Sequence, residues 1–261
     1  MNLQKEIYSD NEQPLDRLVQ SYSYTSIFRK IAFIGDSLSS GEFETRDQEG
    51  NPHWHDMFEH SWGQYIARKN GLTALNFSRG GMSAKQYIES FAGEMCLWDK
   101  EKACQAYVIA LGVNDLLCQH QPIGSADDID VNNYRNNKET FAGFYGQIIS
   151  RYKEISPDAK FFLVTFPKSN GNKPEELEAM VKLMYDIVAR FENCYVIDLN
   201  KIGPEYDDEF KKNFYLYGHL NPMGYVLTAQ LIDSYIDYII RHNPKDFENV
   251  GFINSGIPYK F

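Results

Sequence analysis

Five short runs of mostly apolar residues, separated by stretches with helical spacing, constrain the fold of this chain more than any other feature. Each run is apolar almost throughout, which is typical of strands buried on both faces of a parallel sheet. The runs cover residues 30–35, 73–78, 106–112, 160–166 and 194–199. The predicted helices cover residues 61–71, 83–95, 138–155, 174–191 and 221–242. Alternating strands and helices form right-handed βαβ units, so the sequence predicts an α/β fold, a three-layer α/β/α sandwich with a five-stranded parallel sheet.

The length and composition are typical of one large domain. The chain has 261 residues, 43% of them hydrophobic, and no low-complexity linker divides it. This is enough to bury one substantial core. We expect a single domain over residues 1–261, with a core of about 29–242. The N-terminal residues 1–28 and the partly apolar C-terminal residues 243–261 are expected to pack on the core as extensions.

The charge of the chain argues against several classes of partner. Its formal net charge is −10 at pH 7, whereas nucleic acid and anionic lipid both require a basic face. A small-molecule substrate is therefore expected, with no nucleic acid and no membrane as partner. The N-terminus lacks the apolar region of a secretory signal, and no run of about 18 apolar residues occurs. We expect a cytoplasmic location for the chain as it stands; the sequence does not predict an oligomeric state.

Polar groups that fit acyl transfer follow three of the predicted strands. The first strand ends in Gly35-Asp36-Ser37, the second leads into NFSRGGMS, and the third is followed by Gly112-Val113-Asn114-Asp115. Because the carboxyl ends of parallel strands meet at one edge, a hydroxyl, exposed backbone N–H groups and a carboxamide should share one crevice. Ser37 alone could equally be a helix N-cap. Asp36 and Asp115 are interpreted as acceptors that fix the loops.

A general base is needed beside such a nucleophile, and His219 has the best context among the six histidines. It lies in YLYGHLNPMGY, just before the last predicted helix. His53 and His55 could hold a metal together with Asp56, but they lack a third ligand at recognisable spacing. We therefore expect no metal and no cofactor.

Four short motifs resemble, in order, the sequence blocks of the GDSL esterase/lipase family, which belongs to the SGNH hydrolase superfamily. They are GDSLS at 35–39, NFSRGG at 76–81, GVND at 112–115 and GHLNPMG at 218–224. The resemblance covers roughly residues 30–240 and implies a flavodoxin-like sheet with strand order 2-1-3-4-5.

The resemblance also implies roles for individual residues. Ser37 would be the nucleophile and His219 the general base. The oxyanion hole would consist of the backbone N–H groups of Ser37 and Gly81 and the side chain of Asn114. Gly81 is preferred to Gly80 because it lies five residues after Asn76, as in similar proteins.

The chain departs from the family pattern at one position. The family usually carries an acid three residues before the histidine, and this chain has Leu216 there. Without that carboxylate, another group must orient His219 and stabilise its protonated form. Three candidates follow from the sequence: a backbone carbonyl, a carboxylate from residues 207–209, or a phenol from Tyr215 or Tyr217. A protein with little hydrolytic activity is the remaining interpretation.

The sequence thus predicts a serine hydrolase that cleaves carboxylic esters through an acyl-enzyme. Short acyl groups such as acetyl on carbohydrate are the expected substrates, since Trp54 and Trp62 could stack on sugar rings. We expect Asp36, Trp54 and Arg79 to lie on the substrate side of the site. The alternatives are a lysophospholipase or thioesterase, and a binding protein that kept the fold but lost catalysis.

Overall fold

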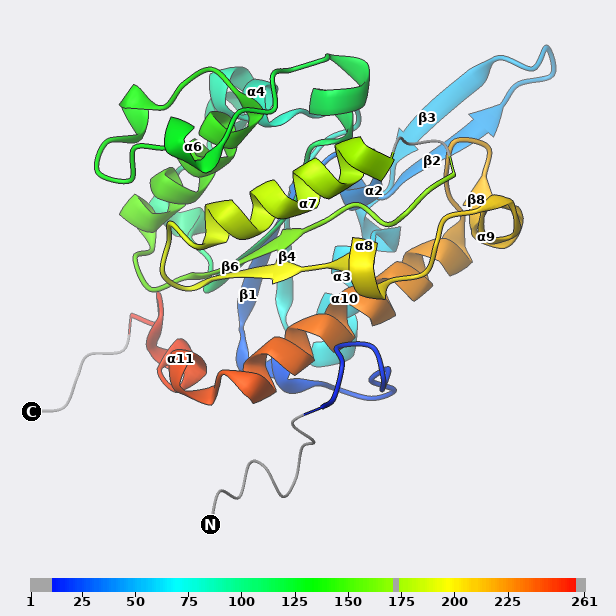
Figure 1. The fold of residues 1–261 in the computed structure, drawn as a ribbon. Helices are drawn as coiled ribbons and strands as arrows, with labels where there is room; N and C mark the ends of the chain where they lie inside the picture. Colours follow the sequence, from blue (N-terminus) through cyan, green and yellow to red (C-terminus); the bar gives the residue numbers. More distant parts are fainter. Residues whose placement is uncertain (1–10, 171–173, 257–261) are drawn as a thin grey trace, which may run out of the picture.

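The computed structural model describes residues 11–170 and 174–256, which form a three-layer α/β/α sandwich around a five-stranded parallel sheet (Figure 1). The strand order is β4-β1-β5-β6-β7, which is the predicted order 2-1-3-4-5 when the two short hairpins are left out. The sheet strands are β1 Lys30–Gly35, β4 Thr73–Ser78, β5 Ala106–Ala110, β6 Lys160–Val164 and β7 Cys194–Ile197. Three of these strands, β5, β6 and β7, end two residues earlier than predicted.

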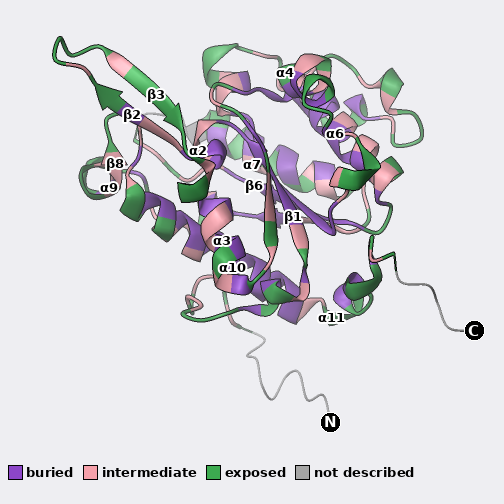
Figure 2. Ribbon diagram, turned by 180° about the vertical axis from the view of Figure 1, so that it is seen from behind, coloured by how far each residue is buried: buried purple, intermediate pink, exposed green. Residues whose placement is uncertain are grey.

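The alternation of side chains along each strand divides the core into two clusters, one on each face of the sheet. In β1, Ala32 and Ile34 face one cluster, whereas Ile31 and Phe33 face the other. The first cluster is covered by α4 Ala84–Gln86, α5 Ala92–Glu94, α6 Phe141–Ile155 and α7 Pro174–Val188. The second is covered by α3 Trp62–Asn70, α8 Leu199–Ile202, α9 Asp208–Phe214, α10 Pro222–His242 and α11 Pro244–Phe247. The sheet strands are therefore mostly buried (Figure 2).

The helix predicted over residues 83–95 is not continuous. A capping box between Ser83 and Gln86 starts α4, but a wider π-helical turn, η3 Tyr87–Phe91, separates it from α5. The wider turn places Tyr87 and Phe91 in the core. The other short helical turns are η1 Tyr24–Ile27, η2 Phe58–His60, η4 Lys100–Lys102, η5 Asn114–Cys118, η6 Ala126–Asp128, η7 Tyr134–Asn136 and η8 Val250–Phe252.

Two hairpins outside the main sheet were not predicted, and both contribute to the site. The first pairs β2 Glu42–Arg46 with β3 Pro52–Asp56 and projects from the body of the molecule (Figures 1 and 2). It follows the short helix α2 Ser37–Ser40, which ends at Gly41 with φ +77°. Glycine adopts this left-handed conformation without strain, so the chain turns directly from α2 into β2. The second hairpin pairs β8 Tyr215–Leu216 with β9 His219–Leu220.

Both terminal segments contact the core where they are described. In residues 11–28, the Ser23 hydroxyl donates to Asp233 of α10 at 2.7 Å. In residues 243–256, Phe247 is buried against Phe28 and Phe162. The predicted extensions also include residues 1–10 and 257–261, which lie outside the described residues. Across the described ranges, no helix combines the length and apolarity that would let it cross a bilayer.

Candidate active site

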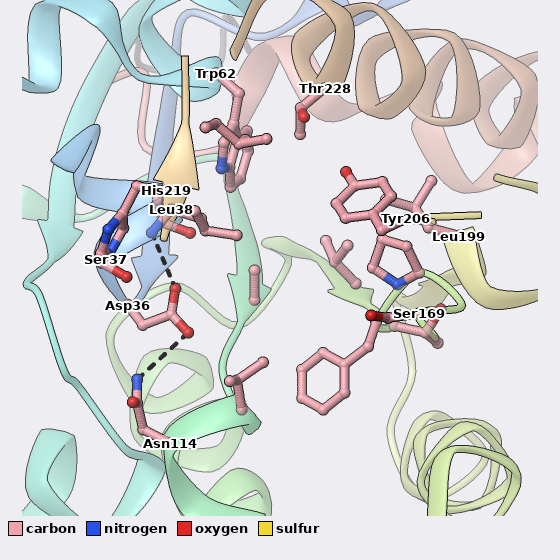
Figure 3. A pocket seen from close by; sticks show the side chains of 18 of the residues that line it. Asp36, Ser37, Leu38, Trp62, Asn114, Ser169, Leu199, Tyr206, His219 and Thr228 are labelled. Carbon is pink, nitrogen blue, oxygen red and sulfur yellow. Dashed lines mark hydrogen bonds between the residues drawn. The ribbon is translucent and has the colours of Figure 1, made fainter. Parts of the chain in front are cut away.

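The register of the sheet brings the three predicted strand exits together. Gly35 at the end of β1 is level with Ser78 of β4 and with Ala110 of β5. The residues that follow Gly35 and Ala110 border a cavity of about 410 Å³ at the carboxyl edge of the sheet, whereas those directly after Ser78 do not line it (Figure 3). Ser37, Asn114 and His219 all line this cavity, although they are far apart in the sequence.

Ser37 is the first residue of α2 and is half-buried in the cavity wall. The residue that caps this helix is Asp36, whose carboxylate accepts a hydrogen bond from the Leu38 N–H at 3.1 Å. The alternative interpretation of Ser37 as an N-cap is therefore wrong. Its hydroxyl is left for another role.

Asp36 links the serine loop to Asn114. The Asn114 amide nitrogen lies 3.5 Å from Asp36 Oδ2 and 3.1 Å from the Met82 carbonyl (Figure 3). Asp36 is only 7% exposed, and this burial raises its pKa to about 7. Asp115 is fully buried and accepts the Ala84 N–H at 2.9 Å, as expected for a loop-fixing acceptor. Burial raises the pKa of Asp115 to about 6.

His219 lies in β9 and faces two carboxylates of β2. Its Nε2 is 3.0 Å from Glu42 Oε1, and its Nδ1 is 3.6 Å from Glu44 Oε2. The first distance is that of a hydrogen bond, whereas the second is a charge contact just beyond that range. All three side chains are mostly buried. Two acidic groups therefore lie within 4 Å of the imidazole.

The two glutamates have opposite electrostatic surroundings. Burial raises the pKa of Glu42, and the nearby carboxylates of Asp56 and Glu44 act in the same direction. A hydrogen bond from the Gly218 N–H lowers the pKa of Glu44, with a further contribution from Arg46. Glu44 is thus held in its charged form, while Glu42 accepts a proton more readily than an ordinary glutamate.

Comparison with known proteins decides the family. The family model described as GDSL-like Lipase/Acylhydrolase matches residues 33–227, which is most of the chain. The chain belongs to this family. Membership of the GDSL-like family supports a hydrolase of the esterase or acylhydrolase type. A comparison with curated protein sequences found no match.

Solved structures with the same fold include carbohydrate esterases. A family two carbohydrate esterase from Clostridium thermocellum in complex with cellohexaose has a TM-score of 0.53 and 17% identity, covering 88% of this chain and 67% of that one. A family 3 carbohydrate esterase from the same organism has a TM-score of 0.52 and 16% identity, covering 82% and 98%. A putative GDSL-like lipase from Bacteroides uniformis has a TM-score of 0.51 and 16% identity, covering 81% and 95%. These likenesses show the SGNH fold.

The structure separates the other predicted site residues from the cavity of this GDSL-like protein. Trp54, Arg79 and Gly81 are not among its lining residues. Arg79 instead packs over the ring of Phe91, with 4.8 Å from the guanidinium carbon to the ring centroid. Trp62 lines the cavity but is 2% exposed and packs edge-on against Phe33, so little of its ring is free to stack on a sugar.

Of the groups expected to replace the family's usual acid, Tyr215 lines the cavity, whereas Asp207 and Tyr217 make other contacts. Asp207 caps α9 by accepting the Phe210 N–H at 2.8 Å, and Tyr217 lies under Arg46. Leu216 is directly opposite His219 in the small hairpin but is 41% exposed. Within the described part of the chain, the buried Nδ1 of His219 has no hydrogen-bond partner, so no backbone carbonyl accepts its proton there.

Glu42 and Glu44 were missed by the sequence analysis, although they follow the serine motif closely. In the sequence Glu-Phe-Glu, the two acids alternate with one apolar residue, which is the pattern of a strand with an acidic face. The family pattern places the acid three residues before the histidine, whereas these two glutamates lie close to Ser37 in sequence. His53 and His55 of the projecting hairpin belong to no cluster of three or more metal-ligating side chains among the described residues.

Proposed function

We propose that the chain is a serine esterase in which Ser37 is the nucleophile and His219 the general base. One observation carries the proposal: the hydroxyl, imidazole and carboxamide of three separate sequence blocks line the same cavity. These are the groups that acyl transfer requires, namely a nucleophile, a base and a donor for the developing oxyanion.

The reaction would proceed through an acyl-enzyme. His219 takes the proton from Ser37 Oγ while this oxygen attacks the ester carbonyl carbon. The oxygen of the tetrahedral intermediate is held by the N–H group of Ser37 and by the Asn114 amide, which both line the cavity. The long contact from Asn114 to Asp36, at 3.5 Å, is the one that a substrate oxygen would replace. The protonated imidazole then donates to the leaving alcohol, and water hydrolyses the acyl-enzyme with His219 again as base.

Acetyl groups on carbohydrate are the substrates that we favour. Trp54 is 57% exposed and is paired with Glu44 across the projecting hairpin, so the two side chains are on one face. Its indole therefore lies on the face that carries the glutamates beside His219, where a sugar ring could stack. The cellohexaose complex of a carbohydrate esterase with this fold agrees with such a substrate.

Esters with a longer acyl chain are the second candidate. Apolar side chains dominate the inner part of the cavity, among them Leu38, Val164, Phe166, Leu199 and Ile232. This lining extends well beyond what an acetyl group needs. Lysophospholipids and acyl thioesters carry such chains.

Substitution of the serine tests the proposal. Ser37→Ala is expected to abolish hydrolysis of p-nitrophenyl acetate and labelling by a fluorophosphonate probe, with the fold intact by circular dichroism. Ser90→Ala, outside the cavity, is the matched control and should behave as wild type. Undiminished turnover in Ser37→Ala would remove the serine from the reaction. A wild-type protein that neither labels nor hydrolyses any ester would favour the non-catalytic binding protein.

A panel of substrates separates the two substrate classes. The proposal for carbohydrate predicts the highest kcat/KM on acetylated oligosaccharides and a fall along p-nitrophenyl esters of rising chain length. A rise along that series would favour the longer acyl chains.

A further inference from the structure

The base of the proposed esterase needs a negative charge beside it. When His219 takes the Ser37 proton, a positive imidazolium forms in a largely buried site. Serine hydrolases stabilise this cation, and fix the ring, with a carboxylate. The position that usually supplies it in this family is Leu216, which has no charge.

The projecting hairpin brings carboxylates to the ring instead. Glu42 and Glu44 are two residues apart in one strand, so their side chains leave the same face of β2. That face is directed at β9, and the two side chains meet His219 at different ring nitrogens, Nε2 at 3.0 Å and Nδ1 at 3.6 Å.

We propose that Glu42 and Glu44 together supply the charge that Leu216 cannot and act as positioning residues. Glu44 keeps its place beside Nδ1 of His219 during catalysis, whereas the contact of Nε2 with Glu42 gives way to one with the Ser37 hydroxyl, whose proton Nε2 takes. This inference rests on the proposed function of Ser37 and His219. It assigns the acidic part of the site to a strand that follows the nucleophile, rather than to the segment before the histidine.

Contacts outside the ring hold Glu42 in place. The Tyr225 hydroxyl of α10 donates to the Glu42 carbonyl at 2.6 Å. The carboxylate lies against Gly80, where an added Cβ would come within 2.1 Å of Oε2. A side chain at residue 80 would therefore push this carboxylate away. Asp56, which pairs with Glu42 across the hairpin, accepts a hydrogen bond from the Ser40 hydroxyl of α2.

Glu44 is attached to the histidine hairpin itself. Its Oε2 accepts the Gly218 N–H at 2.9 Å, and its other oxygen pairs with Arg46. This hydrogen bond to the residue before His219 fixes the position of the Glu44 carboxylate relative to the ring. The 3.6 Å separation from Nδ1 would shorten when the ring becomes charged, because catalytic hydrogen bonds are often long before substrate binds.

Several other charged or titratable groups border this cluster. They are Arg46 of β2, Asp56 of β3, Asp36 before α2, Tyr215 and Tyr217 of the small hairpin, and Tyr225 of α10. Of these, Arg46 is the one cation, and it pairs with Glu44 and stacks on Tyr217. The net charge around the imidazole is negative, which would stabilise the cation that forms when His219 takes the Ser37 proton.

Glutamine variants test the inference, with kcat, KM and the full pH–rate profile measured on p-nitrophenyl acetate. Glu42→Gln and Glu44→Gln should each lower kcat about ten- to a hundredfold with little change in KM, and the double variant about a thousandfold, because removing the triad acid of a serine protease costs about 10⁴-fold. The acid limb of the profile should move to lower pH in each variant, since less negative charge beside the ring disfavours protonation of the base. Glu44→Asp should recover part of the loss.

Control measurements distinguish failure of this inference from loss of the fold and from failure of the proposed function. Glu49→Gln lies at the exposed tip of the same hairpin and should match wild type in rate and profile. Thermal unfolding of each variant checks its fold. A double variant that keeps more than a third of the wild-type kcat, or that loses activity without movement of the acid limb, overturns the inference. Undiminished turnover in Ser37→Ala would instead overturn the proposed function.

Discussion

Asp36 is a buried carboxylate in the wall of the cavity, and its surroundings determine how folding depends on pH. An aspartate in an unfolded chain has a pKa near 3.9, whereas burial raises the pKa of Asp36 in the folded protein to about 7. Folding therefore takes up a proton between about pH 4 and pH 7. The contribution of this residue to stability falls as the pH rises through that window.

Removing this titration should change the pH dependence of stability in a defined direction. Asp36→Asn keeps a side-chain oxygen for the Leu38 N–H but cannot ionise. We expect the urea midpoint of Asp36→Asn, relative to wild type, to increase from pH 5 to pH 8. The exposed Asp127→Asn is the control and should show no such trend. A difference that stays constant between pH 5 and pH 8 would contradict the assigned environment of Asp36.

Individual site residues differ in how far the sequence can predict them. Ser37 and Asn114 follow strand ends, and the parallel sheet brings such ends together in any sequence of this class. Glu42 and Glu44 depend on how β2 pairs with β3 and where the small hairpin meets that pair. No local pattern encodes that long-range contact, so the sequence indicated a missing acid but not its replacement.

At the scale of elements, the buried strands were predictable and the hairpins were not. The sheet strands are mostly apolar, which is the pattern of strands covered on both faces. β2 reads EFETR and β3 reads PHWHD, both largely polar, so neither has the apolar alternation that marks a half-buried strand. They pair with each other, and Phe43 of β2 also packs against the second core cluster. The π-helical turn in residues 87–91 likewise depends on packing against the core.

The outer part of the projecting hairpin should affect binding more than chemistry. Trp54→Ala is expected to raise KM for acetylated oligosaccharides about two- to tenfold, as loss of one aromatic stacking contact of about 0.5–1.5 kcal/mol would do. The kcat on p-nitrophenyl acetate should remain within about twofold, since this small ester does not reach the indole. Tyr22→Ala, an exposed aromatic residue of the N-terminal segment, is the matched control. An unchanged KM on the oligosaccharides would remove Trp54 from the substrate site.

At the scale of the whole molecule, the two ends of the sheet have different tasks. The carboxyl ends of the strands border the cavity, whereas the opposite end is closed by Phe28, Phe162, Tyr195 and Phe247. The C-terminal segment adds two hydrogen bonds there, from Arg29 to the carbonyls of Gly251 and Ile253. Stability and catalysis should therefore respond to different substitutions.

A substitution in the aromatic cluster tests this separation. Phe247→Ala removes a ring that is 4% exposed, so the free energy of unfolding should fall by about 3–5 kcal/mol. The kcat of the folded protein at low temperature should be unchanged, because the ring is remote from the cavity. Urea unfolding and active-site titration with a fluorophosphonate measure the two quantities. Phe252→Ala, an exposed neighbour, should change stability by about 0.5 kcal/mol or less. A large loss of kcat in the folded Phe247 variant would show that the two ends are coupled.

The projecting hairpin sets a limit on how this protein can be redesigned. Its first residues face His219 and its outward residues face solvent, so exchanging the whole loop for one from another esterase would alter selectivity and reactivity together. A graft that begins after Arg46 and ends before Asp56 would leave the inner carboxylates and their anchors in place. Libraries aimed at new alcohols should therefore randomise the stretch from Asp47 to His55 and keep the residues at both ends of the hairpin constant.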